Sequence, residues 1–184
     1  MCGSGVVYDP LIEGRRYEFG ISGLLFKRNL LFYDRETGSL WSQLLSEAVT
    51  GPLAGKRLVV LPAENTTWRA WKAAHSETRV LSFVTGYARD YKQDPYAEYL
   101  FPRNPALLVS VVGRMKIYPF SALKKAQSPV IDHIGGHEVS ILYDRSNKTA
   151  RIADQRSEVT AFVSFLDDLK AFFPEAEIYR APRR

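Results

Sequence analysis

The chain has 184 residues, of which 46% are hydrophobic and 24% charged, a balance typical of a globular domain with a sizeable core and unlike a disordered segment. Lys and Arg outnumber Asp and Glu by 25 to 20, but the basic residues are scattered, apart from Arg183 and Arg184 at the end. Because a nucleic-acid interface needs clustered basic residues, nucleic acid is disfavoured as a partner.

No apolar run reaches the roughly 18 residues of a membrane span, and the N-terminus lacks a basic stretch followed by an apolar one. We therefore expect a soluble chain, cytoplasmic as written. Cys2 is the single cysteine, so no intrachain disulfide can form. Strand-like residues begin as early as Val6, which suggests that upstream sequence is missing.

Clusters of β-branched and aromatic residues between Gly, Pro and Asp predict strands in the first third of the chain. These strands are expected at residues 5–8, 16–20, 24–33, 40–45 and 47–50, with a buried strand at 56–61. A short helix follows, because Trp68, Trp71 and Ala74 fall at helical spacing behind a Thr available as N-cap. A strand at 79–82 ends this part.

Residues 84–105 show neither period and predict a long ordered loop, a kind of segment that is often functional. The following elements are expected to be strands 107–112 and 115–118, a helix 121–126, a turn at Gly135-Gly136, a hairpin of 138–143 with 149–153, a helix 159–173 and a strand 177–180. The helix 159–173 is predicted because its apolar residues, among them Phe162, Leu166 and Leu169, fall on one face.

Two pairs of segments resemble each other and indicate an internal repeat. VVYDPLIEGRRYEF (6–19) parallels ILYDRSNKTARIAD (141–154), and WKAAHSETRVL (71–81) parallels LKAFFPEAEIY (169–179). We therefore expect a single domain, 1–184, with pseudo-repeats at about 4–82 and 107–180, separated by the loop 83–106. The first copy carries an elaboration between about Ile21 and Pro62. Chance similarity of two strand–helix–strand stretches is the alternative.

These elements predict an α+β fold, mostly antiparallel β-sheet with two or three short helices. Large aromatic side chains are expected to anchor the core. They are Trp41, Trp68, Trp71, Phe162, Phe165 and Phe173.

Asp34 and Arg35 could supply a carboxylate poised by a guanidinium for acid–base chemistry, with Asp90 as a second carboxylate. The alternative is a hairpin turn in which Asp34 accepts backbone N–H groups, Thr37-Gly38 turns the chain and Arg35 pairs on the surface.

Two segments could together line a pocket for a polar ligand. The candidate binding residues are Ser39, Trp41 and Gln43 on the hairpin and Tyr87, Arg89, Tyr91 and Tyr96 on the loop. The sequence thus favours a small-molecule or partner-binding module with a pocket near residues 34–43 and 87–99. The alternative is an enzyme that uses Asp34, Arg35 and Asp90 for acid–base or metal-assisted chemistry on a small polar substrate.

Metal binding has one weak candidate, His133 and His137, because the four-residue spacing would place both imidazoles on one helix face. Gly135-Gly136 indicates a turn there instead. His75 is expected to end the helix that begins near Trp68, where an imidazole complements the carbonyl end. Cys2 after Met1 resembles an N-terminal nucleophile, but no other part of such a site follows.

Several ordered stretches of the sequence resemble the domain of unknown function 3179 family. They are CGSGVVYD, FGISGLLFKRNLLFYDRETGSLWSQ, GPLAGKRL, TTWRAWKAAHSETRVLS and GYARDYKQDPY, followed more weakly by KIYPFSAL and VIDHIGGHEVSILYD. The resemblance implies bacterial or archaeal proteins without an established activity, so ligand and cofactor stay unknown. Members of that family read Cys-Pro-Leu-Cys-Gly where this chain starts Met1-Cys2-Gly3, which implies a shortened member that retains one of two cysteines.

Overall fold

The computed structural model describes residues 4–80, 104–153 and 158–182, and these ranges contain fifteen strands and three short helices. The strands are β1 (Val7–Tyr8), β2 (Leu11–Ile12), β3 (Arg15–Arg16), β4 (Phe19–Phe26), β5 (Asn29–Asp34), β6 (Leu40–Ser42), β7 (Glu47–Thr50), β8 (Val60–Leu61), β9 (Pro105–Val111), β10 (Arg114–Pro119), β11 (Val130–Ile134), β12 (His137–Asp144), β13 (Thr149–Ile152), β14 (Val159–Phe165) and β15 (Glu177–Ile178). The helices are α1 (Trp68–Ala74), α2 (Phe120–Leu123) and α3 (Leu166–Phe172). Nearly all pairing is antiparallel, so the predicted β-rich α+β class is confirmed.

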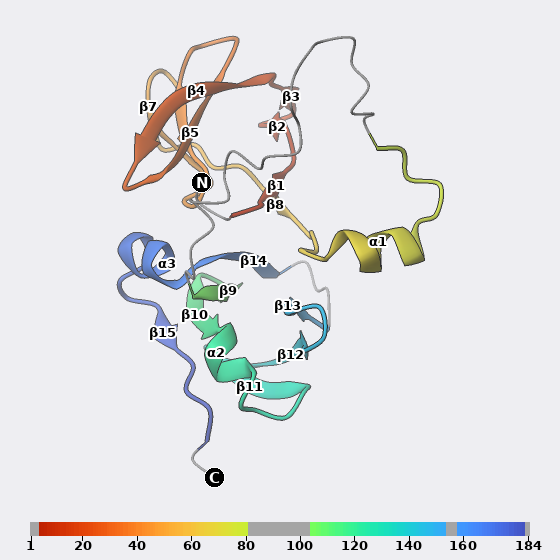
Figure 1. The fold of residues 1–184 in the computed structure, drawn as a ribbon. Helices are drawn as coiled ribbons and strands as arrows, with labels where there is room; N and C mark the ends of the chain where they lie inside the picture. Colours follow the sequence, from red (N-terminus) through yellow and green to blue (C-terminus); the bar gives the residue numbers. More distant parts are fainter. Residues whose placement is uncertain (1–3, 81–103, 154–157, 183–184) are drawn as a thin grey trace.

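The first unit, residues 4–61, is built on the antiparallel sheet β4-β5-β6-β7, with the small pairs β2–β3 and β1–β8 beside it (Figure 1). Its core gathers Ile12, Tyr17, Phe32, Trp41 and Leu58. The aromatic rings pack edge to face, with Phe19 5.3 Å from Phe32 and 5.8 Å from Trp41 between ring centroids. Rings in this arrangement bury much area in a fixed geometry.

The edge strand β4 contains a bulge, because its register with β5 shifts between Ile21 and Leu25. Gly23 adopts a positive φ of 75° there, a conformation that glycine reaches without a steric cost. The Ser22 hydroxyl donates to Leu31 O and accepts from Leu24 N, so the bulge is held by side-chain hydrogen bonds.

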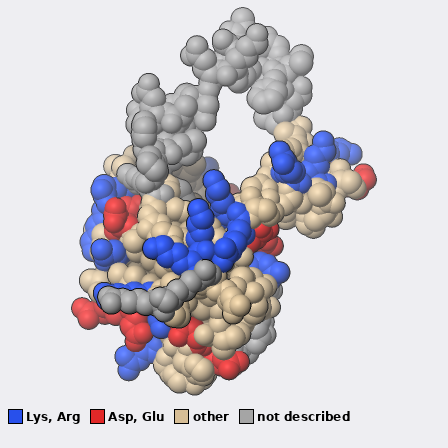
Figure 2. Space-filling model, turned by 60° about the horizontal axis from the view of Figure 1, so that its bottom comes forward, with Lys and Arg blue, Asp and Glu red and all other residues tan. Residues whose placement is uncertain are grey.

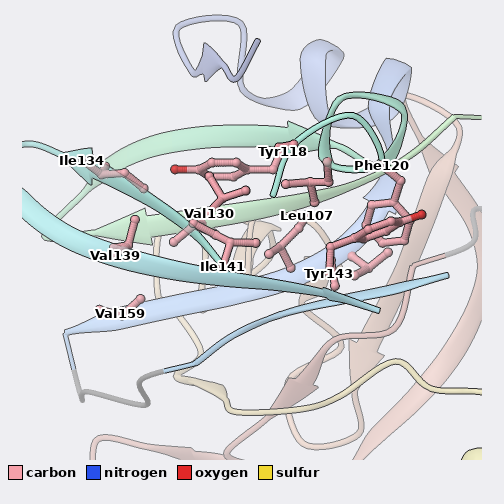
Figure 3. Close-up of a cluster of buried hydrophobic side chains, with 14 of the residues drawn as sticks. Leu107, Tyr118, Phe120, Val130, Ile134, Val139, Ile141, Tyr143 and Val159 are labelled. Atoms are coloured by element: carbon pink, nitrogen blue, oxygen red, sulfur yellow. The ribbon is translucent and has the colours of Figure 1, made fainter. Parts of the chain in front are cut away.

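The second unit, residues 104–182, packs the sheet β14-β9-β10-β15 against the three-stranded sheet β11-β12-β13. Figure 3 shows the side chains between the layers, which come from both sheets and from α2. Labelled there are Leu107, Tyr118, Phe120, Val130, Ile134, Val139, Ile141, Tyr143 and Val159. Alternate residues of β12 are buried, as expected for a strand with one face on a core.

The two units contact each other through backbone and side chains. Gly5 forms an antiparallel bridge with Val163 of β14. Leu44, from the segment after β6, is buried in the cluster formed by α3 and β9, and Phe26 lies 5.8 Å from Phe172 between ring centroids. The buried cluster therefore continues from one unit into the other.

The segment predicted as the helix 159–173 is instead a strand followed by a helix. Val159–Phe165 forms β14 and pairs with β9 over its whole length, and only Leu166–Phe172 is helical. Because β14 is covered on both faces, its apolar residues show no clear alternation and mimic a helix face.

Several predicted strands have different bounds in the structure; the predicted strand 16–20 falls on the end of β3 and the start of β4, and 40–45 is reduced to β6. The predicted strand 24–33 is divided by a turn at Lys27 and Arg28, both with positive φ. The predicted buried strand 56–61 is reduced to β8, and Val59 beside it is exposed. β8 begins at Val60, where the strand pairs with Tyr8 of β1.

The aromatic residues expected in the core differ in burial. Trp41 is fully buried and Phe162 is buried, while Phe165 and Phe173 are half-buried. Trp68 and Trp71 are 50% and 40% exposed, so the prediction that they anchor the core is wrong.

The predicted helix beginning at Trp68 is confirmed, with Thr67 as its N-cap accepting from Ala70 N at 3.2 Å and His75 as its C-cap. Arg79 and Val80 lie outside any strand, and the rest of the predicted strand 79–82 lies outside the described residues. The internal repeat and its boundaries stay predictions. Within the described ranges, no helix is long and apolar enough to cross a membrane.

Candidate functional site

Asp34 closes the turn between β5 and β6 with both of its carboxylate oxygens. Thr37 donates to Oδ1 from its backbone N–H at 2.6 Å and from its hydroxyl at 2.8 Å. The indole Nε1–H of Trp41 donates to Oδ2 at 3.0 Å. Both Asp34 and Trp41 are 0% exposed, so this hydrogen-bonded group forms the interior of the hairpin.

The environment of Asp34 favours its ionised form. Burial alone would raise the pKa of the carboxyl, but the hydrogen bonds from Trp41 and Thr37 outweigh it and lower the pKa below the usual value. A general acid–base carboxyl works best with a pKa near the operating pH, which is the opposite shift. Asp34 thus has the geometry of the hairpin-turn interpretation.

Arg35 and Glu36 also take part in local contacts of the turn. The Arg35 backbone N–H donates to Glu18 O at 2.8 Å, and its guanidinium lies 5.8 Å from the centroid of the Tyr33 ring. The Glu36 carboxylate accepts from Glu18 N at 3.1 Å. Asp90 lies outside the described residues, so its convergence with Asp34 stays a prediction.

Ser39 is buried inside the same hairpin. Its hydroxyl is 2.6 Å from the Thr37 hydroxyl and accepts from Leu53 N at 3.0 Å. Gly51 passes so close that a Cβ added there would lie 2.7 Å from Ser39 Cα. Ser39 and Trp41, two of the predicted binding residues, are therefore enclosed by their own hairpin.

Gln43 belongs to a different group of polar residues, next to the N-terminal segment. Its Oε1 accepts from the Ser4 hydroxyl at 3.0 Å and from Asn29 Nδ2 at 3.3 Å. The Tyr8 hydroxyl donates to the Gln43 backbone carbonyl. Asn29 is almost fully buried, and these contacts fix the orientation of the Gln43 amide.

Gln43 also lines a depression with a volume of about 310 Å³ on the first unit. The other lining residues are Val6, Tyr8, Pro10, Phe19, Gly20, Ile21, Leu30 and Phe32. Its aromatic wall is continuous, because Tyr8 stacks on Phe32 with ring centroids 5.8 Å apart and Phe19 packs edge-on against Phe32. The depression is thus mainly apolar with one oriented amide on its border.

The Tyr8 phenol beside this depression stays protonated at neutral pH. Burial raises its pKa to about 12, and a hydrogen bond with Ser46 opposes that effect only in part. The hydroxyl therefore keeps its proton for the bond to the Gln43 carbonyl.

The predicted loop residues cannot be placed against this depression. Tyr87, Arg89, Tyr91 and Tyr96 lie outside the described residues. The predicted pocket between residues 34–43 and 87–99 therefore stays a prediction, and of residues 34–43 the depression includes Gln43 alone.

The two histidines of the weak metal candidate lie on a β-hairpin. His133 of β11 pairs with Glu138, and His137 of β12 pairs with Ile134. Because neighbouring residues of a strand point to opposite faces, this register places the two imidazoles on opposite faces of the hairpin. Within the described ranges, no group of three or more His, Cys, Asp or Glu residues could hold a metal ion.

A charged cluster that the sequence analysis did not identify joins the two sheets of the second unit. Lys116 Nζ lies 2.8 Å from Asp132 Oδ2, which also accepts from the Tyr118 hydroxyl at 2.9 Å. Burial is the main cause that raises the pKa of Tyr118 far above its usual value, and the negative charge of Asp132 raises it further. Lys116 and Tyr118 are two apart on one strand, but only the packing of β10 on β11 brings Asp132 to them.

The aromatic wall was likewise not predicted, although its three members stand in strand-like segments.

Figure 2 shows one face of the molecule, on which Lys and Arg side chains gather near the centre while Asp and Glu side chains lie around them. This face carries both signs of charge, and the expectation that nucleic acid is a disfavoured partner stays a prediction.

The comparisons with known proteins agree with the resemblance found in the sequence. No curated protein and no solved structure matches the chain. Residues 1–176 match the family model described as "Protein of unknown function (DUF3179)". Since this match covers nearly the whole chain, the protein belongs to the DUF3179 family.

Proposed function

We propose that the protein is a binding module for a small, flat, largely apolar molecule that carries a hydrogen-bonding group, and that this molecule binds in the depression beside Gln43. The observation that carries the proposal is the continuous wall of Tyr8, Phe32 and Phe19 next to an amide whose orientation is fixed. Ligand pockets commonly combine apolar and aromatic walls with a few oriented polar groups.

The size of the depression supports a small ligand. Its volume of about 310 Å³ stands at the lower end of the range of roughly 300–1,000 Å³ typical of ligand pockets. Ile21, which lies on its border, is 77% exposed and gives a ligand apolar surface to cover. The predicted loop 87–99 would enlarge the site if it lies over this border.

The alternative of an enzyme that uses Asp34 and Arg35 receives less support. Asp34 would have to leave Trp41 and Thr37 before it could reach a substrate, and its lowered pKa opposes proton uptake. A binding function requires no such rearrangement. We therefore favour the binding module.

The test uses indole and benzamide as probes, with binding measured by saturation-transfer NMR and by titration of the ¹⁵N-labelled protein. Both probes should shift the side-chain amide signals of Gln43. Ile21→Asp should weaken binding at least about tenfold, because it places a charge at an apolar border. Leu25→Asp is the matched control, because Leu25 is 67% exposed on the same strand and does not line the depression.

The proposal predicts that the control variant binds like the parent protein. Equal weakening by both variants, or probe-induced shifts confined to other parts of the protein, would contradict it. Absence of binding by both probes would contradict the proposed ligand class.

A further inference from the structure

The side-chain amide of Gln43 is the main polar group on the depression of the first unit. Among the described residues that line it, only Gln43 and Tyr8 carry a polar side-chain atom. The Tyr8 hydroxyl donates its proton to the Gln43 backbone carbonyl. Its hydrogen bond with Ser46 lowers the pKa of the phenol, so the phenol oxygen is the acceptor there. The hydrogen-bonding group of a ligand therefore depends mainly on the Gln43 amide.

The oxygen of this amide is already occupied inside the protein. Gln43 Oε1 accepts from the Ser4 hydroxyl at 3.0 Å and from Asn29 Nδ2 at 3.3 Å. An amide oxygen has two lone pairs, and these two donors use both of them. A ligand N–H or O–H group would have to displace one of the two bonds before it could donate to Oε1.

The nitrogen of the amide has the opposite hydrogen-bonding character. Gln43 Nε2 donates to Ser4 O at 3.5 Å, a length at which a hydrogen bond is weak. A carbonyl oxygen of a ligand can replace such a long bond with a shorter one. The Gln43 amide therefore favours an acceptor on the ligand over a donor.

Asn29 fixes this orientation of the amide from the interior. It is 1% exposed and does not line the depression, and its Nδ2 also donates to Ser4 Oγ at 3.2 Å. Rotating the Gln43 amide by half a turn would set Nε2 against Asn29 Nδ2, and both of these groups are donors. Rotating both amides would set Gln43 Oε1 against Ser4 O, and both of these are acceptors. The hydrogen-bond network therefore selects the orientation in which Oε1 faces Asn29.

We infer that the ligand of the depression is an aryl carbonyl compound, whose carbonyl oxygen accepts a hydrogen bond from Gln43 Nε2. Gln43 is the residue that determines specificity, and Asn29 is a positioning residue that acts through it. The inference rests on the proposed binding function and adds to it the hydrogen-bonding character of the ligand.

Three bicyclic probes of nearly equal size test this character. 1-Indanone carries a carbonyl acceptor, indole carries an N–H donor, and indene has no polar group. Titration of the ¹⁵N-labelled protein gives the Kd of each probe. 1-Indanone should bind about three- to tenfold more tightly than indene, which is the gain expected from one hydrogen bond. Indole should bind no more tightly than indene.

Two substitutions of Gln43 change the group that the ligand meets. Gln43→Met removes the amide at similar size, so it should abolish the preference for 1-indanone. Gln43→Glu replaces the N–H groups with a carboxylate oxygen, so it should bind indole more tightly than 1-indanone. Urea denaturation shows whether each variant is folded.

Asn29→Ala tests the positioning role. Loss of Nδ2 allows the Gln43 amide to rotate, so the preference for 1-indanone over indole should fall severalfold, although residue 29 does not line the depression. A merely structural role of Asn29 would weaken all three probes by the same factor. An unchanged preference in the folded variant would contradict the positioning role.

The outcomes separate this inference from the function on which it rests. Equal affinity of the parent protein for all three probes, weakened by Ile21→Asp but not by Leu25→Asp, would overturn the inference and leave the binding module intact. A preference of the parent protein for indole, or a Gln43→Met variant that still prefers 1-indanone, would also overturn it. If none of the three probes bound, the proposed function and the inference would both be wrong.

Discussion

The hydrogen bond between Trp41 and Asp34 allows a quantitative test of the hairpin interior. Asp34→Ala removes the acceptor of the indole N–H, which lies at 3.0 Å in a fully buried site, and also the acceptor of Thr37. A hydrogen bond to a charged group contributes about 1.5–3 kcal/mol, and a buried donor left without a partner costs about 1–3 kcal/mol. We expect Asp34→Ala to lower the free energy of unfolding by about 3–5 kcal/mol.

A double-mutant cycle with Trp41→Phe isolates the hydrogen bond from the other effects of each substitution. Urea denaturation of the parent, the two single variants and the double variant should give a coupling energy of about 1.5–3 kcal/mol. The m-values should agree among the four proteins. A coupling energy below about 0.5 kcal/mol would mean that the two substitutions act independently, and the reasoning would be refuted.

The pH dependence of the same interaction has a defined sign. Because the pKa of Asp34 is lower in the folded protein than in the unfolded chain, its stabilising contribution is complete above the unfolded pKa, about 3.9. The contribution is lost as the pH falls through the folded pKa. The difference in stability between parent and Asp34→Ala should therefore shrink on acidification.

Two further predictions concern the packing beside this hairpin and the second unit. Gly51→Ala should cost at least about 3 kcal/mol in urea denaturation, because its Cβ would meet Ser39 Cα, whereas Gly55→Ala should cost about 1–2 kcal/mol from its positive φ alone. Equal costs would show that the close approach to Ser39 is unimportant. Lys116→Met should cost about 1–3 kcal/mol at pH 7, because it leaves Asp132 without its cation. Burial raises the pKa of Asp132, but hydrogen bonds, including that from Lys116, lower it overall. The cost of Lys116→Met should therefore fall as the pH drops through the folded pKa of Asp132. A cost that stays constant with pH would contradict the ion pair.

Features that depend on neighbouring residues were predictable from the sequence. The Thr67 N-cap, the turn at Gly135-Gly136 and the acceptor role of Asp34 each follow from interactions within a few residues. The family resemblance could also be identified from the sequence alone, because it rests on long ordered stretches of sequence.

Features that depend on long-range pairing were not predictable. β14 is a strand because it pairs with β9, a segment far away in the sequence. The depression beside Gln43 combines Tyr8, Phe19 and Phe32 from three strands, and local patterns do not show which strands meet. Trp71 is a residue type usually found in a core, so the local pattern predicts its burial. Its exposure depends on which parts of the fold α1 packs against, and the local sequence does not show this.

The bulge in β4 has a consequence for the behaviour of the protein at high concentration. An edge strand with exposed apolar residues such as Ile21 and Leu25 normally offers a template on which another chain can extend the sheet and aggregate. Here the regular pairing register is interrupted between those two residues, and the Ser22 hydroxyl accepts from Leu24 N in the bulge and donates to Leu31 O on β5. The edge therefore lacks a continuous row of regularly spaced donors and acceptors, and the apolar side chains it displays are protected from fibril-like strand addition.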